Sequence, residues 1–227
     1  MIITQWGDNM NTQGYGMRIQ AQIQDWPTDE PITTATLSAD LAGAFNIDIE
    51  SAKKITNVNL KRLADKGELA RVKKGIYGKV KLTPFGRLAP NANEMIAGTL
   101  LRDDGKTIGY IAGPTLLNAI GLSSWIPKER HIITNNYRRR IPTSATIRVY
   151  KPVIQVNDEN APYLQVIEAF TAMEQYPVDA EKPDEILRGM MQKRHINNER
   201  LIWYARKHYG QKILLKTIDI AFGGIEH

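Results

Sequence analysis

Lysines and arginines gather in one segment of the chain, where they could bind phosphate groups. Residues 51–87 contain eleven Lys and Arg against two Asp and Glu, in a protein whose net charge is +6. A helix-like run carries some of these cations, and a hairpin-like segment that turns at Lys73, Lys74 and Gly75 carries others. Such cations bind the nucleic-acid backbone by charge alone. The segment therefore predicts a surface for an anionic polymer.

The side chains of this segment divide into those suited to bases and those suited to phosphates. Asn pairs through its amide with adenine N6 and N7, and Lys donates to guanine O6 and N7. Lysines at a hairpin tip suit phosphates or a minor groove, where the negative charge is diffuse. The predicted DNA-binding residues are Ser51, Lys53, Lys54, Asn57, Lys61, Arg62, Arg71, Lys73, Lys74, Tyr77 and Lys79.

Two of these residues have an equally simple structural interpretation. Tyr77 either stacks on a base or packs at the base of the hairpin, and Arg71 either contacts phosphate or pairs with Asp65 or Glu68. Cations along a helix also occur on faces that meet only solvent. The segment nevertheless favours DNA, because nearly all of its cations fall on one helix face and on the turn.

Two further basic segments carry weaker signals. Residues 186–216 contain eight Lys and Arg against one Glu, which is more typical of solvated helix faces. Arg138, Arg139 and Arg140 follow one another directly. Three adjacent arginines predict either a surface that meets DNA or a protein partner, or a solvated loop between two strands.

Motifs for catalysis and metal binding are absent from the sequence. It has no cysteine, no HExxH, no GxxxxGK[ST] and no GxGxxG. Residues 121–124 begin like a nucleotidyltransferase motif, but no Asp-x-Asp follows to hold two metals. Residues 183–185 lack the Glu-x-Lys partner of a restriction nuclease, and His195 and His208 lack an acid in a triad arrangement. We expect a protein that is not an enzyme and holds neither metal nor cofactor.

Helix signals surround the basic segment. Residues 17–26 have a roughly helical spacing of apolar side chains, and Ser38 is expected to be the N-cap of a short second helix. Asp48 is expected to cap a third helix, which ends before Gly67. The lysines of the segment then lie on the face opposite the apolar residues of that helix.

A predicted hairpin follows the third helix and completes a recognisable unit. Its strands span 68–72 and 76–80, and Gly75 supplies the positive φ that the turn needs. Three helices followed by a hairpin is the order of a winged helix-turn-helix, in which the third helix enters the DNA major groove. We expect this domain over residues 17–88, preceded by a loose leader at 1–16.

The rest of the chain predicts a larger mixed domain. Pro, Gly and Asn punctuate residues 83–93, so we place a boundary there and a second domain at 89–227. Runs rich in β-branched residues predict strands at 131–134 and 145–150. The chain becomes mainly helical after Pro152, with helices expected at 163–173, 184–194, 198–208 and 211–221. The predicted fold class is α+β, an N-terminal winged helix-turn-helix followed by a larger mixed α/β domain with a mainly helical end.

Three segments resemble one known family. Residues 65–77 (DKGELARVKKGIY) resemble the wing segment of AbiEi-type antitoxins, which belong to abortive-infection, type IV toxin–antitoxin systems. Residues 111–125 (IAGPTLLNAIGLSSW) resemble a helix and turn of that family, with Ser123-Ser124-Trp125 where its members usually have a Thr-Thr-polar turn. Residues 134–141 (TNNYRRRI) resemble the strand and basic loop that follow. The resemblance covers residues 32–152.

The resemblance implies a function that charge and spacing alone do not reach. It implies an N-terminal winged helix that represses its own promoter, usually at inverted repeats in double-stranded DNA. It also implies a C-terminal domain that neutralises a toxin of the nucleotidyltransferase class, with or without direct contact. The alternatives are a nuclease or DNA-modification enzyme guided by a winged helix, and a phage or plasmid DNA-binding adaptor.

Composition limits where such a protein works. No apolar run approaches the roughly 18 residues of a membrane span, so we expect no membrane partner. The polar N-terminus lacks a signal pattern. Together with the absence of cysteine, this predicts a cytoplasmic protein.

Overall fold

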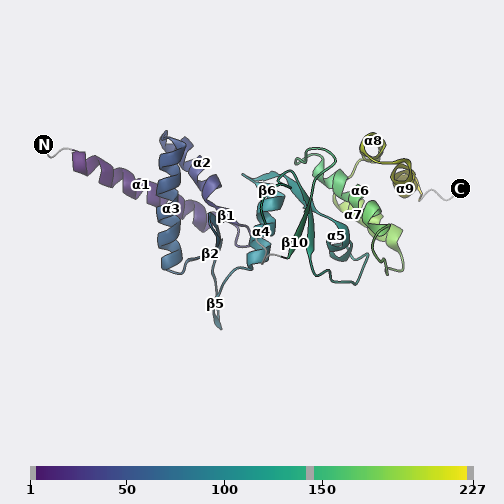
Figure 1. Ribbon diagram of the computed structural model, residues 1–227, viewed down its shortest axis with the longest axis horizontal. Helices are drawn as coiled ribbons and strands as arrows, with labels where there is room; N and C mark the ends of the chain where they lie inside the picture. The colour runs from purple at the N-terminus through teal and green to yellow at the C-terminus, as the bar shows by residue number, and fades with distance from the viewer. Residues whose placement is uncertain (1–3, 142–145, 224–227) are drawn as a thin grey trace. The chain divides into compact units, whose positions relative to one another are not determined.

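The computed structural model describes residues 4–141 and 146–223, and shows an α+β protein (Figure 1). Its contacts divide the chain into two compact units, Met1–Thr99 and Leu100–His227, each with its own helices and strands. No helix within the described ranges is long and apolar enough to cross a membrane.

The N-terminal unit packs helices against a small antiparallel sheet. Strand β3 (Ile76–Lys79) lies between β1 (Ile32–Thr33) and β2 (Leu69–Lys73), and both neighbours run antiparallel to it. The helices are α1 (Thr4–Asp25), α2 (Thr34–Phe45) and α3 (Ile49–Asp65). Their shared core includes Ile19, Ile32, Leu37, Leu41, Leu60 and Leu69.

Local signals define α3 and the hairpin as predicted. The carboxylate of Asp48 accepts the backbone N–H of Ser51 at 2.9 Å, which caps the first turn of α3. Gly67 follows the helix with φ +73°, and Gly75 forms the hairpin turn with φ +77°. Both glycines take the left-handed conformation that other residues rarely adopt.

The expected leader and the expected cap of the second helix are both wrong. Residues 4–16 are helical, because α1 docks on α2: the ring of Tyr15 meets that of Phe45 edge-on at 4.7 Å. The side chain that caps α2 is Thr33, which accepts the N–H of Thr36 at 3.1 Å. Ser38 lies fully buried one turn inside the helix.

The boundary between the two units falls later than residue 88. A second hairpin, β4 (Lys81–Thr83) and β5 (Gly86–Leu88), projects from the N-terminal unit, and α4 (Ala92–Leu101) follows it (Figure 1). Pro90 and Met95 lie against the backbone of Gly78, where an added Cβ would come within 2.7 Å of Pro90. This packing is consistent with the boundary at Thr99, which leaves most of α4 in the N-terminal unit.

The C-terminal unit contains a mixed sheet and a helical layer. Strand β9 (Arg130–Thr134) pairs antiparallel with β8 (Gly109–Ile111) and parallel with β10 (Ile147–Tyr150), which confirms the predicted strand at 131–134 and, of the one predicted at 145–150, residues 147–150; residue 145 lies outside the described residues. A short hairpin, β6 (Arg102–Asp103) and β7 (Lys106–Thr107), precedes them. The helices, close to their predicted positions, are α5 (Gly113–Ala119), α6 (Ala161–Met173), α7 (Pro183–Lys193), α8 (Asn198–His208) and α9 (Gln211–Phe222). Helices α5 and α6 lie on one side of the sheet (Figure 1).

Candidate nucleic-acid interface

Helix α3 and the β2–β3 hairpin border an open groove of about 530 Å³. The core side of α3 is buried through Ala52, Thr56, Leu60 and Leu63, so its other face turns outward. That outward face brings Asn57 and Lys61 to the groove, and the hairpin brings Arg71 and Lys74. The structure therefore places side chains from two predicted elements around one surface, which we call the α3–hairpin groove.

Thr34, the first residue of α2, ties the two walls of this groove together. Its hydroxyl donates to Asn57 Oδ1 at 3.1 Å, and its backbone N–H donates to the carbonyl of Gly75 at 3.0 Å. The start of α2, the middle of α3 and the hairpin turn are thus joined at one residue. Asn57 Oδ1 has a second lone pair besides the one that accepts the Thr34 hydroxyl, so the amide can still both donate and accept.

The cations of the groove are available to a ligand. Lys61, Arg71 and Lys74 line the groove and Lys54 lies on α3 outside its lining; all four are exposed, and none of their side chains forms a hydrogen bond or ion pair with any residue in the described ranges. The alternative pairing of Arg71 with Asp65 or Glu68 is therefore not observed. Asp65 also lines the groove, so its floor is not purely basic.

Several predicted contacts do not line the groove. The Lys53 ammonium forms an ion pair with the Glu50 carboxylate at 2.7 Å. The backbone N–H of Ser51 donates to the Asp48 carboxylate that caps α3. Arg62 is exposed but lies outside the groove lining, and Lys73 is half-buried with interactions of its own. These residues remain at or near the basic surface without forming its centre.

Tyr77 and Lys79 both have structural roles within the N-terminal unit. Tyr77 is only 4% exposed and packs in the N-terminal core, which favours the packing interpretation, although it also lines the α3–hairpin groove. Lys79 donates through Nζ to the carbonyl of Gln24 at 2.8 Å, which ties β3 to α1. It belongs to a separate depression beside α1 and not to the α3–hairpin groove.

Val58 is a residue that the sequence reasoning missed. It is 49% exposed, although it is apolar. On α3 it stands four residues after Lys54 and three before Lys61, on the outward face. An apolar group among donors suits the methyl group of thymine. The signal was available in the sequence, as an apolar residue on the charged face of a helix.

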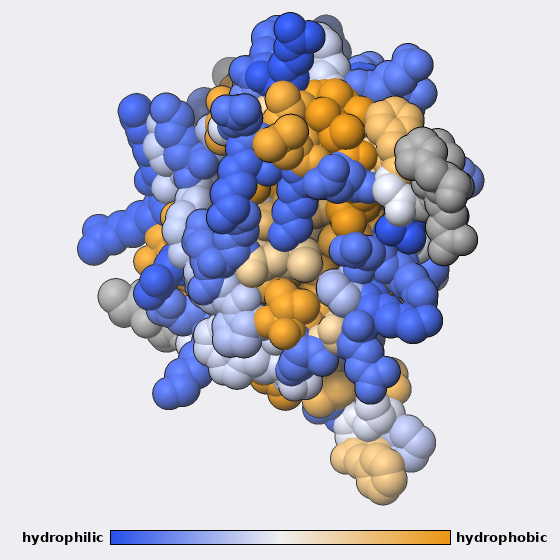
Figure 2. Space-filling model, turned by 90° about the vertical axis from the view of Figure 1, so that its right-hand side faces the viewer, coloured by the Kyte–Doolittle hydropathy of each residue, from blue (hydrophilic) through white to orange (hydrophobic). Residues whose placement is uncertain are grey.

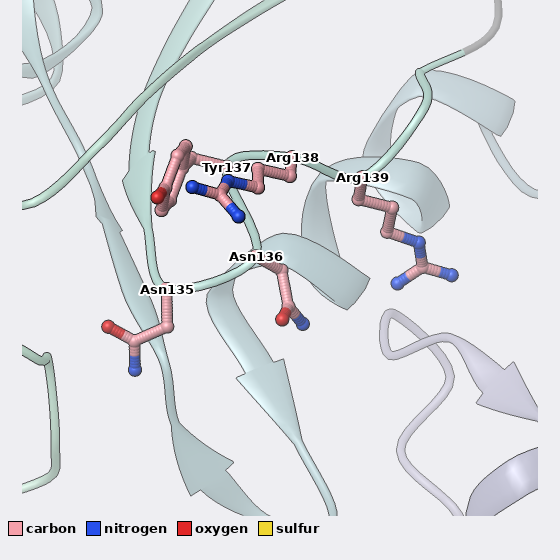
Figure 3. Close-up of a pocket in the computed structure, with 5 residues that line it drawn as sticks. All are labelled: Asn135, Asn136, Tyr137, Arg138 and Arg139. Atoms are coloured by element: carbon pink, nitrogen blue, oxygen red, sulfur yellow. The ribbon is translucent and has the colours of Figure 1, made fainter.

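Arg138 and Arg139 of the predicted arginine run line a surface pocket of about 570 Å³ on the C-terminal unit (Figure 3), and Arg140 follows them in the chain. Arg138 lies along the ring of Tyr137, with its guanidinium carbon 5.4 Å from the ring centre, whereas Arg139 points away from it (Figure 3). Lys151, which was not predicted, places Nζ 5.8 Å from the same ring. Arg139 and Arg140 also have interactions of their own.

Exposed apolar side chains gather on α9 and on the β4–β5 hairpin, among other places. Helix α9 presents Leu215, Ile218 and Phe222 at helical spacing, and the β4–β5 hairpin presents others, including a fully exposed Phe85. Figure 2 faces the end of the ribbon that carries α8 and α9, and shows orange side chains gathered near its top among blue ones. Exposed apolar patches of this kind often mark binding surfaces.

No group of three or more His, Asp or Glu that could hold a metal ion occurs in the parts of the chain that the structure describes.

In comparisons with known proteins, the model of a family described as "Family of unknown function (DUF6088)" matches residues 38–198. A search of curated proteins finds no match.

Proposed function

The chain belongs to DUF6088, a family of unknown function, and from its own geometry we propose that it binds double-stranded DNA through an N-terminal winged helix-turn-helix. The observation that carries this proposal is the α3–hairpin groove. There, Asn57 and Lys61 of one helix and Arg71 and Lys74 of the hairpin face the same open space.

The order of elements supports the winged-helix assignment. Helix α1, strand β1, helices α2 and α3, and the β2–β3 hairpin follow one another, and the sheet order is β1-β3-β2. Asn46, which ends α2 with φ 50°, makes the turn between α2 and α3 tight. In this assignment α3 is the recognition helix and the β2–β3 hairpin is the wing.

The exposed residues in and beside the groove form two sets, one suited to base edges and the other to phosphates. Lys54, Asn57 and Val58 lie on the outward face of α3, and offer two kinds of donor and one apolar contact to base edges in the major groove. Arg71 and Lys74 on the wing offer positive charge to phosphates. The first set would carry sequence preference, and the second would carry affinity for any duplex.

The biological setting that we propose rests on the sequence resemblance to AbiEi-type antitoxins. We infer a cytoplasmic autorepressor whose C-terminal unit counters a nucleotidyltransferase-class toxin. The exposed face of α9, with Leu215, Ile218 and Phe222, supports a protein partner for that unit. Growth of cells that co-express such a toxin with and without this protein tests this half of the proposal.

DNA binding is tested by removing the wing cations. Arg71→Ala with Lys74→Ala should weaken the promoter duplex and a random duplex alike, and should flatten the slope of log affinity against log salt by about 2, because two phosphate contacts are lost. Fluorescence anisotropy over a salt series measures both effects. Lys128→Ala with Lys193→Ala removes the same charge from exposed positions outside the groove and is the control.

Two outcomes would contradict the proposal. Failure of the intact protein to bind duplex DNA would refute the DNA-binding role itself. Equal slopes for the wing variant and the control would mean that the hairpin is not a wing. Cleavage of the duplex in the presence of magnesium would instead favour the nuclease alternative.

A further inference from the structure

The C-terminal unit carries a second cationic site, formed by Arg138 and Lys151 around the ring of Tyr137. We propose that this site binds phosphates of the same DNA duplex, independently of sequence, and that it supplements the N-terminal groove. The inference rests on the proposed DNA-binding function.

The turn that carries Arg138 is held firmly. The Asn135 side chain accepts the backbone N–H of Val156 and donates to its carbonyl, each at 2.8 Å. The hydroxyl of Thr134, at the end of β9, accepts the N–H of Asn136 at 3.2 Å. The turn is therefore fastened both to the sheet and to the chain beyond β10, and little ordering is needed when a ligand arrives.

The two cations are ordered by a shared aromatic ring. The guanidinium carbon of Arg138 lies 5.4 Å from the centre of the Tyr137 ring, and Lys151 Nζ lies 5.8 Å from it. Both distances fall within the range of cation–π attraction. The ring thus contacts two cations, and an anion beside either of them would be attracted by its charge.

The lining of the pocket favours phosphate over the other anionic ligands. Among the residues that the structure describes, the lining consists of Asn135, Asn136, Tyr137, Arg138 and Arg139, and this described part includes no carboxylate and no aliphatic side chain (Figure 3). An acidic protein partner would usually need an apolar centre, where most of the binding energy of such interfaces lies. The tyrosine ring already engages two cations, so it is less suited to stacking on a base. A surface that offers positive charge but no apolar anchor is suited to the phosphates of the DNA backbone.

A tethered second contact does not require a fixed arrangement of the two units. Once the N-terminal groove holds a duplex, the chain keeps the Arg138 site at a high effective concentration near the same duplex. Each phosphate contact that then forms releases counterions and steepens the salt dependence of binding. The affinity of the full chain should therefore exceed what the groove residues alone would give.

The experiment uses the full chain and a random-sequence duplex. Arg138→Gln with Lys151→Gln should reduce the salt slope by about 2 between roughly 50 and 200 mM salt, with a matching loss of affinity for promoter DNA. Tyr137→Phe keeps the ring and should keep the wild-type slope, whereas Tyr137→Ala should lose part of it. Lys128→Gln with Lys193→Gln is the control, and circular dichroism checks that each variant is folded.

The possible results separate the two ideas. An unchanged slope for Arg138→Gln with Lys151→Gln, while the wing variant Arg71→Ala with Lys74→Ala still lowers it, would overturn the second site and leave the first intact. If the double variant does not fold, the single variant Arg138→Gln distinguishes the same outcomes at about half the effect on the slope. Absence of any binding by the intact protein would refute the DNA-binding function and this site with it.

Discussion

A largely buried carboxyl predicts how the stability of the C-terminal unit depends on pH. Glu168 lies on α6, and burial raises its pKa from the ordinary value of 4.5 to about 7. The N–H of Gly113 donates to its Oε1 at 3.1 Å, which opposes that rise because it favours the charged form. The desolvation of the carboxylate is the larger effect.

The sign of the pH dependence follows from which state holds the proton. Between pH 4.5 and about 7 the native protein keeps a proton on Glu168 that the unfolded chain has released. Stability therefore falls as the pH rises through this window and levels off above it. The difference between the two pKa values corresponds to about 3 kcal/mol of unfolding free energy.

Glu168→Gln is the perturbation that isolates this effect. Glutamine still offers an oxygen to the Gly113 N–H but does not titrate, so the variant should match the wild type near pH 4.5. At pH 8 it should be more stable by up to about 3 kcal/mol. Urea unfolding followed by circular dichroism at several pH values measures the difference.

Other titrating groups do not obscure the stability difference between the wild type and Glu168→Gln. Burial also lowers the pKa of His131, whose effect has the opposite sign, but His131 is present in both proteins and cancels in the difference. Tyr110 and Tyr209 have pKa values raised by burial, above the window. A stability difference that stays constant between pH 4.5 and 8 would refute the account of Glu168.

Two further predictions concern the α3–hairpin groove. Asn57→Ala should cost about 1–3 kcal/mol on promoter DNA and leave random DNA nearly unchanged, because the hydrogen bonds of its amide to a base edge are lost; equal losses on both duplexes in anisotropy titrations would mean that Asn57 does not read sequence. Gly75→Ala should destabilise the protein by about 1–2 kcal/mol in thermal or urea unfolding, since φ is +77° there. Gly43→Ala, in α2 with open space around it, is the matched control and should be neutral or stabilising, so similar losses for both variants would contradict the assigned strain.

Local signals in the sequence were sufficient to predict α3 and its hairpin. Asp48 caps the helix through its own third neighbour, Ser51, and Gly67 and Gly75 mark places where the chain needs a positive φ. Such features depend on residues a few positions apart, so they can be recognised without knowing the rest of the fold. The groove cations Lys61 and Lys74 followed from the same local pattern.

The errors arose where distant residues decide the outcome. Tyr77 lines the groove but is largely buried in the core, and Lys79 donates to the carbonyl of Gln24, 55 residues away in the sequence. Residues 4–16 looked like a leader because their own pattern is weakly amphipathic, and the contact of Tyr15 with Phe45 accompanies their helical structure. The contribution of Lys151 to the Tyr137 ring was invisible for the same reason.

The double hydrogen bonding of Thr34 has a consequence for the kinetics and heat of association. Because this residue fastens α3 and the hairpin turn to α2, both walls of the groove are already in place before a duplex arrives. Little backbone entropy is then lost on binding, and no folding step precedes the encounter. The association rate should accordingly be set by diffusion and charge, and the heat-capacity change on binding should be small for the area covered.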